Sequence, residues 1–193
     1  VEPLNVAIAV DVSGSMSGAP LGDAKSAIRH FIASMDFSFT RLAILAVSDR
    51  TETICGLSDD EQRCLRAVDA ITCGSVGYGN ADHPFGVIER MLENEDGRLF
   101  AIVLADGVWE HQDRAVSAAK DCNRAGIETA AIGFGSANQN FLKDISSEDA
   151  NALLVQQSEL SSAFGSIAQS IVGDASGASN YLSPAVEADT WAS

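Results

Sequence analysis

NVAIAV at residues 5–10, followed at once by DVSGS at residues 11–15, decides the fold of this chain. The first run is short, apolar and rich in β-branched side chains, which predicts a buried strand. LAILAV at 42–47 and LFAIVL at 99–104 have the same character. Strands that are apolar at nearly every position are typical of a parallel sheet covered on both faces, because neither face meets water. The sequence therefore predicts an α/β domain.

Helical patterns separate the expected strands. Pro20 suits the first turn of a helix over residues 20–35, where apolar residues recur at helical spacing. Ser58 and Glu61 are spaced as a capping box at the start of a helix over residues 58–71. The other expected elements are an edge strand at 51–54, helices at 83–92, 110–125, 138–145 and 158–172, and strands at 127–132 and 152–155. This alternation predicts a doubly wound, mostly parallel sheet with helices on both faces.

The alternating pattern covers residues 1–172, which we expect to form one α/β domain. Residues 173–193 are rich in Ser, Ala and Gly and are expected to be a flexible tail or linker. A chain of 193 residues is long enough to bury a core without covalent or metal staples. No apolar run approaches the ~20 residues of a membrane-spanning helix, so we expect no membrane span in this chain.

The chain is strongly acidic, since 27 Asp and Glu against 12 Lys and Arg give a formal net charge of −15. A field of this sign repels phosphate backbones, so we expect no nucleic-acid partner. The charge favours cations and the basic patches of partner proteins, although a role in solubility alone also accounts for it.

The cysteines show no C-x-x-C spacing and no neighbouring histidine in a zinc pattern. Cys122 lies in a helical stretch and is expected to be a small buried hydrophobe. Spacing leaves a disulfide among Cys55, Cys64 and Cys73 open, but free thiols in a reducing compartment are the simpler interpretation and favour the cytoplasm. Because the chain starts at Val1 and not at Met, we expect a fragment or a processed chain, and an extracellular location stays open.

Polar turns follow two of the predicted strands, and ligands of open parallel sheets bind beyond the carboxyl ends of the strands. Asp11, Ser13 and Ser15 alternate along a tight loop, so their oxygens can point to one centre. Asp106 adds a second carboxylate from the turn after the strand at 99–104. Such an oxygen set suits Mg²⁺ or Mn²⁺. An Asp or Glu of a protein partner could fill an open position on the ion, which would allow recognition without a catalytic base.

The motif D-x-S-x-S at residues 11–15, directly after a buried strand, resembles the metal-ion-dependent adhesion site (MIDAS) of von Willebrand factor type A (vWA) domains. LADG at 104–107 resembles the second aspartate turn of that family, and the order of strands and helices agrees over residues 3–172. The resemblance implies a Rossmann-like fold, a divalent cation and protein–protein recognition without enzymatic activity. MSGAPL at 16–21 is similar to the intracellular bacterial branch, which includes vWA proteins of tellurium-resistance clusters.

The chain departs from the family pattern where a middle loop normally supplies a threonine. The alignment of GYGN at residues 77–80 places Asn80 there, and its amide carbonyl can still offer an oxygen. A shift of one or two residues would place Ala81 or Asp82 there instead, and Asp82 would add a third negative charge. The residues that we expect to hold the metal are Asp11, Ser13, Ser15, Asn80 and Asp106.

Other classes of function have weaker support. One is a metal-independent assembly scaffold with a vestigial site, and another, implied by family analogy, is an accessory subunit of an ATPase- or chelatase-type complex. Among enzymes, a D-x-D phosphotransferase would need a carboxylate where Ser13 stands, and a serine hydrolase would need a G-x-S-x-G elbow. GFGSAN at 133–138 lacks the third glycine of a dinucleotide motif. Trp109 is expected either to anchor a partner at the rim of the site or to pack in the core.

Overall fold

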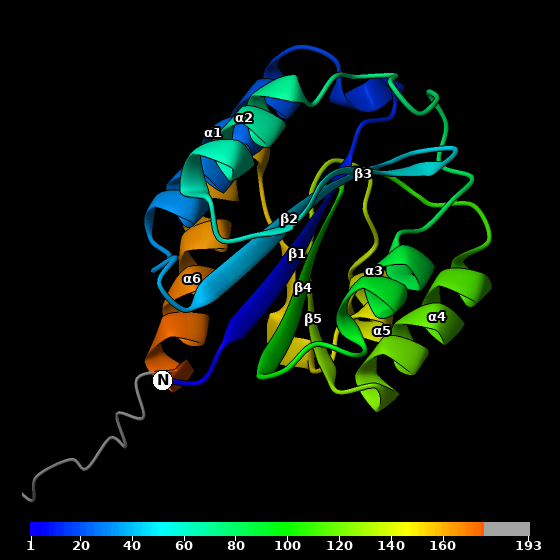
Figure 1. Cartoon of the computed structure of the whole chain (residues 1–193). Helices are drawn as coiled ribbons and strands as arrows, with labels where there is room; N and C mark the ends of the chain where they lie inside the picture. The colour runs from blue at the N-terminus through cyan, green and yellow to red at the C-terminus, as the bar shows by residue number, and fades with distance from the viewer. Residues whose placement is uncertain (176–193) are drawn as a thin grey trace, which may run out of the picture.

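The computed structural model describes residues 1–175, which form one six-stranded sheet in the order β3-β2-β1-β4-β5-β6 (Figure 1). The strands are β1 (Leu4–Asp11), β2 (Thr40–Val47), β3 (Thr51–Ser58), β4 (Arg98–Ala105), β5 (Ile127–Gly133) and β6 (Ala152–Leu154). Neighbouring strands pair in parallel, except that β3 runs antiparallel to β2 at one edge. The strand order reverses between β1 and β4, and at such a switch point doubly wound sheets bind their ligands.

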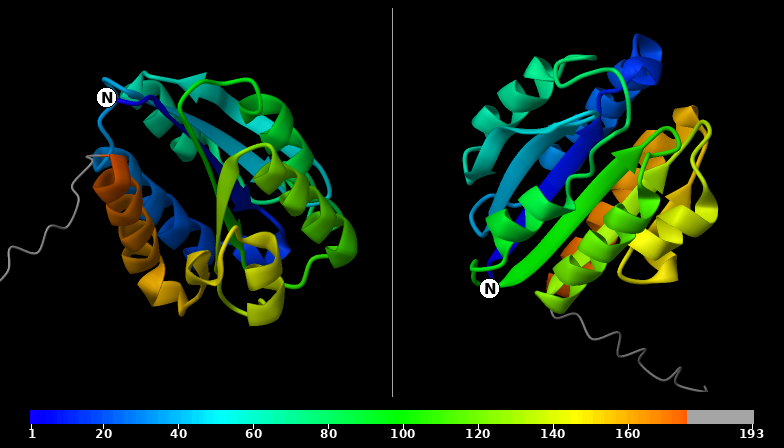
Figure 2. Two further views of the ribbon diagram at one scale, coloured as in Figure 1. Left: turned by 90° about the horizontal axis from the view of Figure 1, so that it is seen from below. Right: turned by 90° about the vertical axis from the view of Figure 1, so that its right-hand side faces the viewer.

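Helices cover both faces of this sheet (Figures 1 and 2). One face carries α1 (Ala19–Ala33), α2 (Glu61–Ala70) and α6 (Leu160–Ala175). The other face carries α3 (Phe85–Leu92), α4 (Gln112–Arg124) and α5 (Gln139–Ile145). Short 3-10 turns lie at Gly14–Met16, Asp149–Asn151 and Gln157–Glu159. The predicted doubly wound, mostly parallel fold is therefore confirmed.

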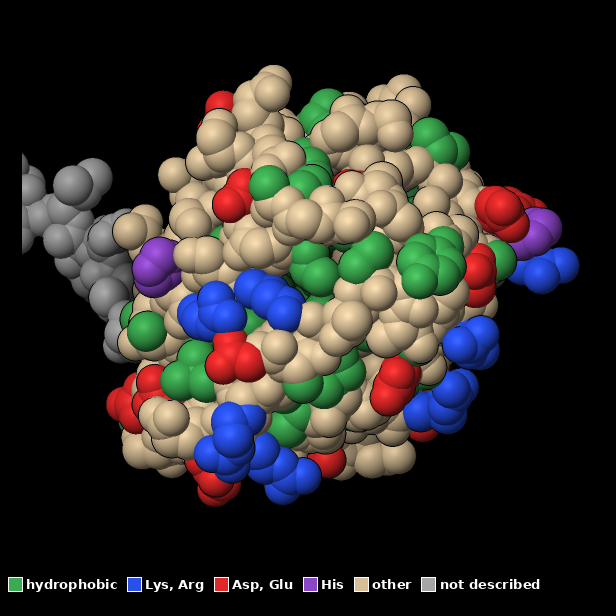
Figure 3. All heavy atoms as spheres, turned by 90° about the horizontal axis from the view of Figure 1, so that it is seen from above, with side chains coloured by type: hydrophobic (Ala, Val, Ile, Leu, Met, Phe, Trp, Pro, Cys, Tyr) green, Lys and Arg blue, Asp and Glu red, His purple; other side chains and the backbone are tan. Residues whose placement is uncertain are grey.

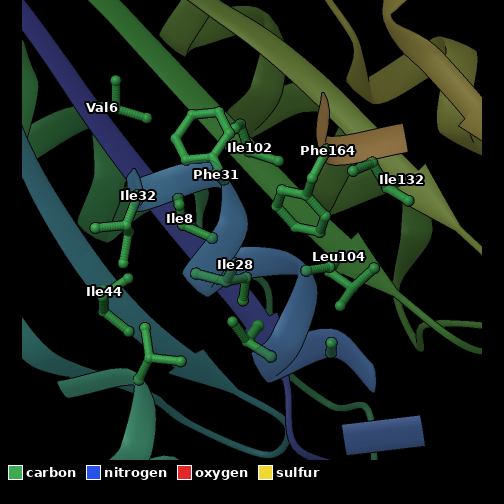
Figure 4. Packing of buried hydrophobic residues seen from close by; sticks show 14 of the residues in the cluster. Val6, Ile8, Ile28, Phe31, Ile32, Ile44, Ile102, Leu104, Ile132 and Phe164 are labelled. Carbon is green, nitrogen blue, oxygen red and sulfur yellow. The ribbon is translucent and has the colours of Figure 1, made fainter. Parts of the chain in front are cut away.

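Two hydrophobic cores hold the layers together, one on each side of the sheet. Alternate side chains of β1 enter different cores, so that Ile8 packs toward α1 and α6 while Ala9 packs toward α3 and α4. In the larger core, shown in Figure 4, Phe31 of α1 meets Phe164 of α6 edge to face with ring centroids 6.1 Å apart. Because helices cover both faces of the sheet, the side chains of its strands are buried on either side, which explains the continuous apolar runs in the sequence.

The predicted capping box at the start of α2 is wrong. Ser58 is the last residue of β3, which runs past the end of the expected strand at 51–54. Asp60 caps α2 instead, because its carboxylate accepts the backbone N–H of Arg63 at 3.1 Å. The Ser58 hydroxyl accepts the N–H of Asp60 at 3.1 Å, so it supports the turn and not the helix. Because the edge strand pairs with β2 over a longer stretch than predicted, the helix starts later in the sequence than predicted.

The last helix, α6, extends beyond the predicted domain boundary at residue 172 and is described as far as Ala175. The rest of the predicted tail, residues 176–193, lies outside the described residues. Within residues 1–175, no helix is both long and apolar enough to cross a bilayer.

All four cysteines are free thiols, so the disulfide that the spacing left open is not formed. Cys122 is buried, as expected. Burial raises the pKa of the Cys64 and Cys122 thiols to about 12, which keeps both protonated and unreactive.

Gly97 offers a test of the backbone packing between β1 and β4. It has a φ of +85°, and a Cβ there would lie 2.2 Å from the carbonyl oxygen of Pro3. We expect Gly97→Ala to lower the free energy of unfolding, measured with urea, by at least about 2 kcal/mol. Gly22, in α1, is the matched control because a Cβ there has no neighbour within 4 Å. Gly22→Ala should raise the same free energy by about 0.5–1 kcal/mol, and equal effects of the two substitutions would contradict the structure.

Candidate functional site

Two aspartates meet where the neighbouring strands β1 and β4 end. Val10 pairs with Leu104 in parallel register, so Asp11 and Asp106 leave the sheet side by side. The backbone nitrogen of Asp106 lies 3.4 Å from Oδ2 of Asp11. Both residues are almost fully buried, with exposed fractions of 1% for Asp11 and 6% for Asp106. The fold thus brings together two carboxylates that are 95 positions apart in the sequence.

The loop after β1 turns its polar groups toward Asp11. The backbone N–H of Ser13 donates to Oδ1 of Asp11 at 2.8 Å, and the hydroxyl oxygens of Ser13 and Ser15 lie 3.2 Å apart. The 3-10 turn Gly14–Met16 folds the loop back, and the buried Met16 side chain anchors it in the core. Asp11, Ser13 and Ser15 therefore form one compact cluster of oxygens.

Burial disfavours negative charge on Asp11. Desolvation raises the pKa of Asp11 to about 6; the hydrogen bonds from Ser13 oppose this shift, and the charge of Asp106 adds to it. Oδ1 of Asp106 is buried and has no hydrogen-bond partner among the described residues. A buried carboxylate oxygen without a donor is costly, and a bound cation would satisfy it.

The donor set is made of oxygens, which are the ligands that hard divalent cations prefer. In the part of the chain that the structure describes, no group of three or more His, Cys, Asp or Glu side chains could hold a metal ion. A cation between Asp11 and Asp106 would therefore also need the neutral oxygens of Ser13 and Ser15. Such a set fits Mg²⁺ or Mn²⁺ better than softer metals, which favour thiolate or imidazole ligands.

Asn80 lies beside the turn that carries Asp106. Its side-chain nitrogen is 3.9 Å from the position that a Cβ would take at Gly107. Asp82 is engaged elsewhere, because its carboxylate accepts the hydroxyl of Thr51 at 2.8 Å. Of the three residues considered for the middle loop, Asn80 is the one whose side chain lies next to the Asp106 turn.

Sequence reasoning missed Asp49, which fixes the glycine-rich loop. Its Oδ2 accepts the backbone N–H groups of Tyr78 and Gly79, each at 3.2 Å. A Cβ would lie 2.3 Å from Oδ2 at Gly77 and 2.4 Å from Oδ1 at Gly79, so glycine leaves room for this carboxylate. The available signal was the position of Asp49 just after the apolar run at 42–47, where turns of a parallel sheet carry functional groups.

Trp109 packs in the core and does not form a rim. Its ring meets the Phe141 ring in a T-shaped contact with centroids 5.7 Å apart, and the Phe85 ring at 6.4 Å. The packing interpretation is thus confirmed and the anchor interpretation is wrong. The large hydrophobic side chains exposed on the loops of the site are instead Tyr78, at 71%, and Val108, at 57%.

Comparison with solved structures finds the same fold at low sequence identity. The von Willebrand factor domain of the type V pili tip protein Mfa5 from Porphyromonas gingivalis matches with a TM-score of 0.79 at 13% identity, covering 90% of this chain and 96% of that one. The conserved hypothetical protein BatB from Bacteroides thetaiotaomicron matches with a TM-score of 0.76 at 20% identity, covering 90% and 99%.

A third match is proximal thread matrix protein 1 from the mussel byssus, in a structure with a zinc-occupied MIDAS motif. It matches with a TM-score of 0.77 at 17% identity, covering 88% of this chain and 46% of that one, so this chain spans about half of its length. At these identities, the three matches establish the fold alone.

A search of curated proteins finds no significant match. The profile of the von Willebrand factor type A domain matches residues 5–169, which include the sheet and nearly all of its helices. Domains of this type are commonly non-enzymatic modules of protein interaction or adhesion. The match spans most of the chain, and the chain therefore belongs to the von Willebrand factor type A domain family.

Proposed function

We propose that this vWA domain recognises a protein partner through a divalent cation, Mg²⁺ or Mn²⁺. The residues that would hold the ion are Asp11, Ser13, Ser15 and Asp106, with Asn80 assisting directly or through water. The observation that carries the proposal is the unpartnered, buried Oδ1 of Asp106 beside the buried carboxylate of Asp11.

The ligands of the site leave coordination positions on the cation that a partner could occupy. Mg²⁺ takes six oxygen ligands and keeps some of them as water. Asp11 and Asp106 balance the charge of the ion, while the hydroxyls of Ser13 and Ser15 add neutral oxygens. Positions that hold water can accept an Asp or Glu from a partner. The zinc-occupied MIDAS motif of the mussel byssus protein supports a divalent ion at this place in the fold.

A second candidate function is a metal-independent scaffold, including an accessory subunit of an ATPase- or chelatase-type complex. Two observations favour it. The pKa of Asp11 is raised to about 6, so a proton can compete with a cation for this carboxylate. The alignment of the glycine-rich loop also puts Asn80, and no threonine, at the position of the family's third ligand. Capture of a partner would resist EDTA if the domain is a scaffold, and would be lost in EDTA if the cation takes part.

The cellular setting is part of the proposal. Four free thiols suit a reducing compartment such as the cytoplasm. The solved structures of similar fold include a pilus tip protein, so the fold itself fits more than one compartment. Placement in the bacterial branch of tellurium-resistance proteins rests on the run MSGAPL at residues 16–21.

Calorimetric titration of Mg²⁺ and Mn²⁺ into EDTA-stripped protein tests the metal site directly. We expect saturable binding, and we expect Asp11→Ala to weaken it by more than about 100-fold because a ligating carboxylate is removed. Asp82→Asn is the matched control, since Asp82 bonds to Thr51 and not to the site. Unchanged cation affinity in Asp11→Ala would overturn the proposal.

The role of Asn80 is tested by exchanging its oxygen. Asn80→Thr restores the family's hydroxyl and should tighten Mg²⁺ binding, whereas Asn80→Ala removes the oxygen and should weaken it, each by about three- to tenfold. The same calorimetric titration measures both. If both variants bind like the wild type, Asn80 does not assist the ion.

Metal-free protein should gain stability when Asp11 loses its charge. Its pKa is about 6 in the folded protein against an ordinary value of 3.8, so its protonation stabilises the fold below that ordinary value and the benefit is lost as the pH rises through 6. In EDTA at about pH 8, Asp11→Asn should raise the free energy of unfolding by about 3 kcal/mol, with a smaller gain at about pH 5. Urea unfolding measures this, with the exposed Asp59→Asn as control. A gain that did not vary with pH would contradict the assigned cause.

A further inference from the structure

We propose that Tyr78 and Val108 form an apolar rim that selects a partner carboxylate flanked by hydrophobic side chains. The inference rests on the proposed metal site and specifies its partner: one Asp or Glu set among apolar residues, on a surface without further negative charge. Both rim residues are strongly exposed, and each belongs to a loop that carries a proposed ligand, Asn80 or Asp106.

The loop that carries Tyr78 is held firmly although the side chain is exposed. The carbonyl oxygen of Tyr78 accepts the N–H of Gly14 at 2.9 Å, and its own N–H donates to Asp49. The ring lies over Gly74, where a Cβ would come within 2.4 Å of it. A partner can bury an aromatic ring that is already fixed in this way with little loss of conformational entropy.

Val108 is displayed in a similar way from the turn after β4. On one side of it, the carbonyl oxygen of Asp106 accepts the N–H of Ser136 at 3.2 Å. On the other side, Trp109 is buried against Phe85 and Phe141. Trp109 is thus fixed in the core, while Val108 is exposed on the same turn, two residues after the proposed metal ligand Asp106.

The negative net charge of the chain restricts which partners can bind. A bound divalent cation removes only two of the 15 net negative charges, so a strongly acidic partner would still be repelled. Figure 3 looks down on the end of the molecule where β1 and β4 finish: hydrophobic side chains lie among uncharged atoms over its middle, and most Lys and Arg side chains lie toward its margin. A single carboxylate between apolar side chains fits this surface best.

Three capped pentapeptides test the proposal by NMR titration in saturating Mg²⁺. Acetyl-GLDLG-amide has a carboxylate between two leucines, acetyl-GGDGG-amide has the carboxylate alone, and acetyl-GLNLG-amide has the leucines without the carboxylate. We expect the first peptide to bind about five- to tenfold more tightly than the second, through partial burial of the leucines on the rim. The third should bind more weakly than the first by a similar or larger factor.

The double variant Tyr78→Ser/Val108→Ser should bind the first two peptides equally while keeping its affinity for Mg²⁺ and for GGDGG. Val108→Ser alone should remove part of the preference, which guards against disturbance of the Tyr78 loop. Val172→Ser is the matched control, because Val172 is an exposed valine near the end of α6, far from the site (Figure 1).

Equal binding of GLDLG and GGDGG by the wild type would overturn the rim, and so would no measurable binding of either peptide. A preference for GLDLG that survives in the double variant would also overturn it. Absence of Mg²⁺ binding in the calorimetric titration would overturn the metal site itself.

Discussion

The parallel register of β1 with β4 is the constraint on which the site depends. It fixes Asp11 and Asp106 side by side at the switch point of the sheet. Both strands are buried on both faces, so neither can slide to separate the two carboxylates without moving every core side chain to a wrong position. The fold therefore carries an electrostatic cost at this edge, and a proton or a cation can relieve it. Features that lower the stability of a fold in this way are typical of functional sites.

The loops around these aspartates are tied to one another and not only to their own strands. The Gly14 segment bonds to Tyr78 of the glycine-rich loop, and the Asp106 turn bonds to Ser136 after β5. Asp49, which follows β2, receives two further N–H groups of the glycine-rich loop. Turns that follow four strands are thus linked by hydrogen bonds. A site linked in this way is organised before any ligand arrives, so binding would cost little reordering.

The sequence predicted the sheet and the two-aspartate site because their signals are local. Apolar runs mark buried strands, and the D-x-S-x-S and D-G turns follow them directly. The sequence misplaced Ser58, left the role of Trp109 undecided and did not single out Asp49, because the surroundings of all three are set by chain segments far away in the sequence. Pairing with β2 decides where β3 ends, packing against Phe85 and Phe141 buries Trp109, and the return of the glycine-rich loop gives Asp49 its partners.

The proposed ion and the proposed rim would divide the work of recognition. An ion held by Asp11 and Asp106 attracts any accessible carboxylate, so it supplies affinity with little choice between partners. The apolar side chains of Tyr78 and Val108 favour carboxylates with hydrophobic neighbours, and the acidic surface disfavours partners with many negative charges. Specificity arises from such differences between partners and not from the strength of the shared contact. If Asn80 takes the place of the family's threonine, it would alter the strength of the metal contact while leaving the choice of partner to the rim.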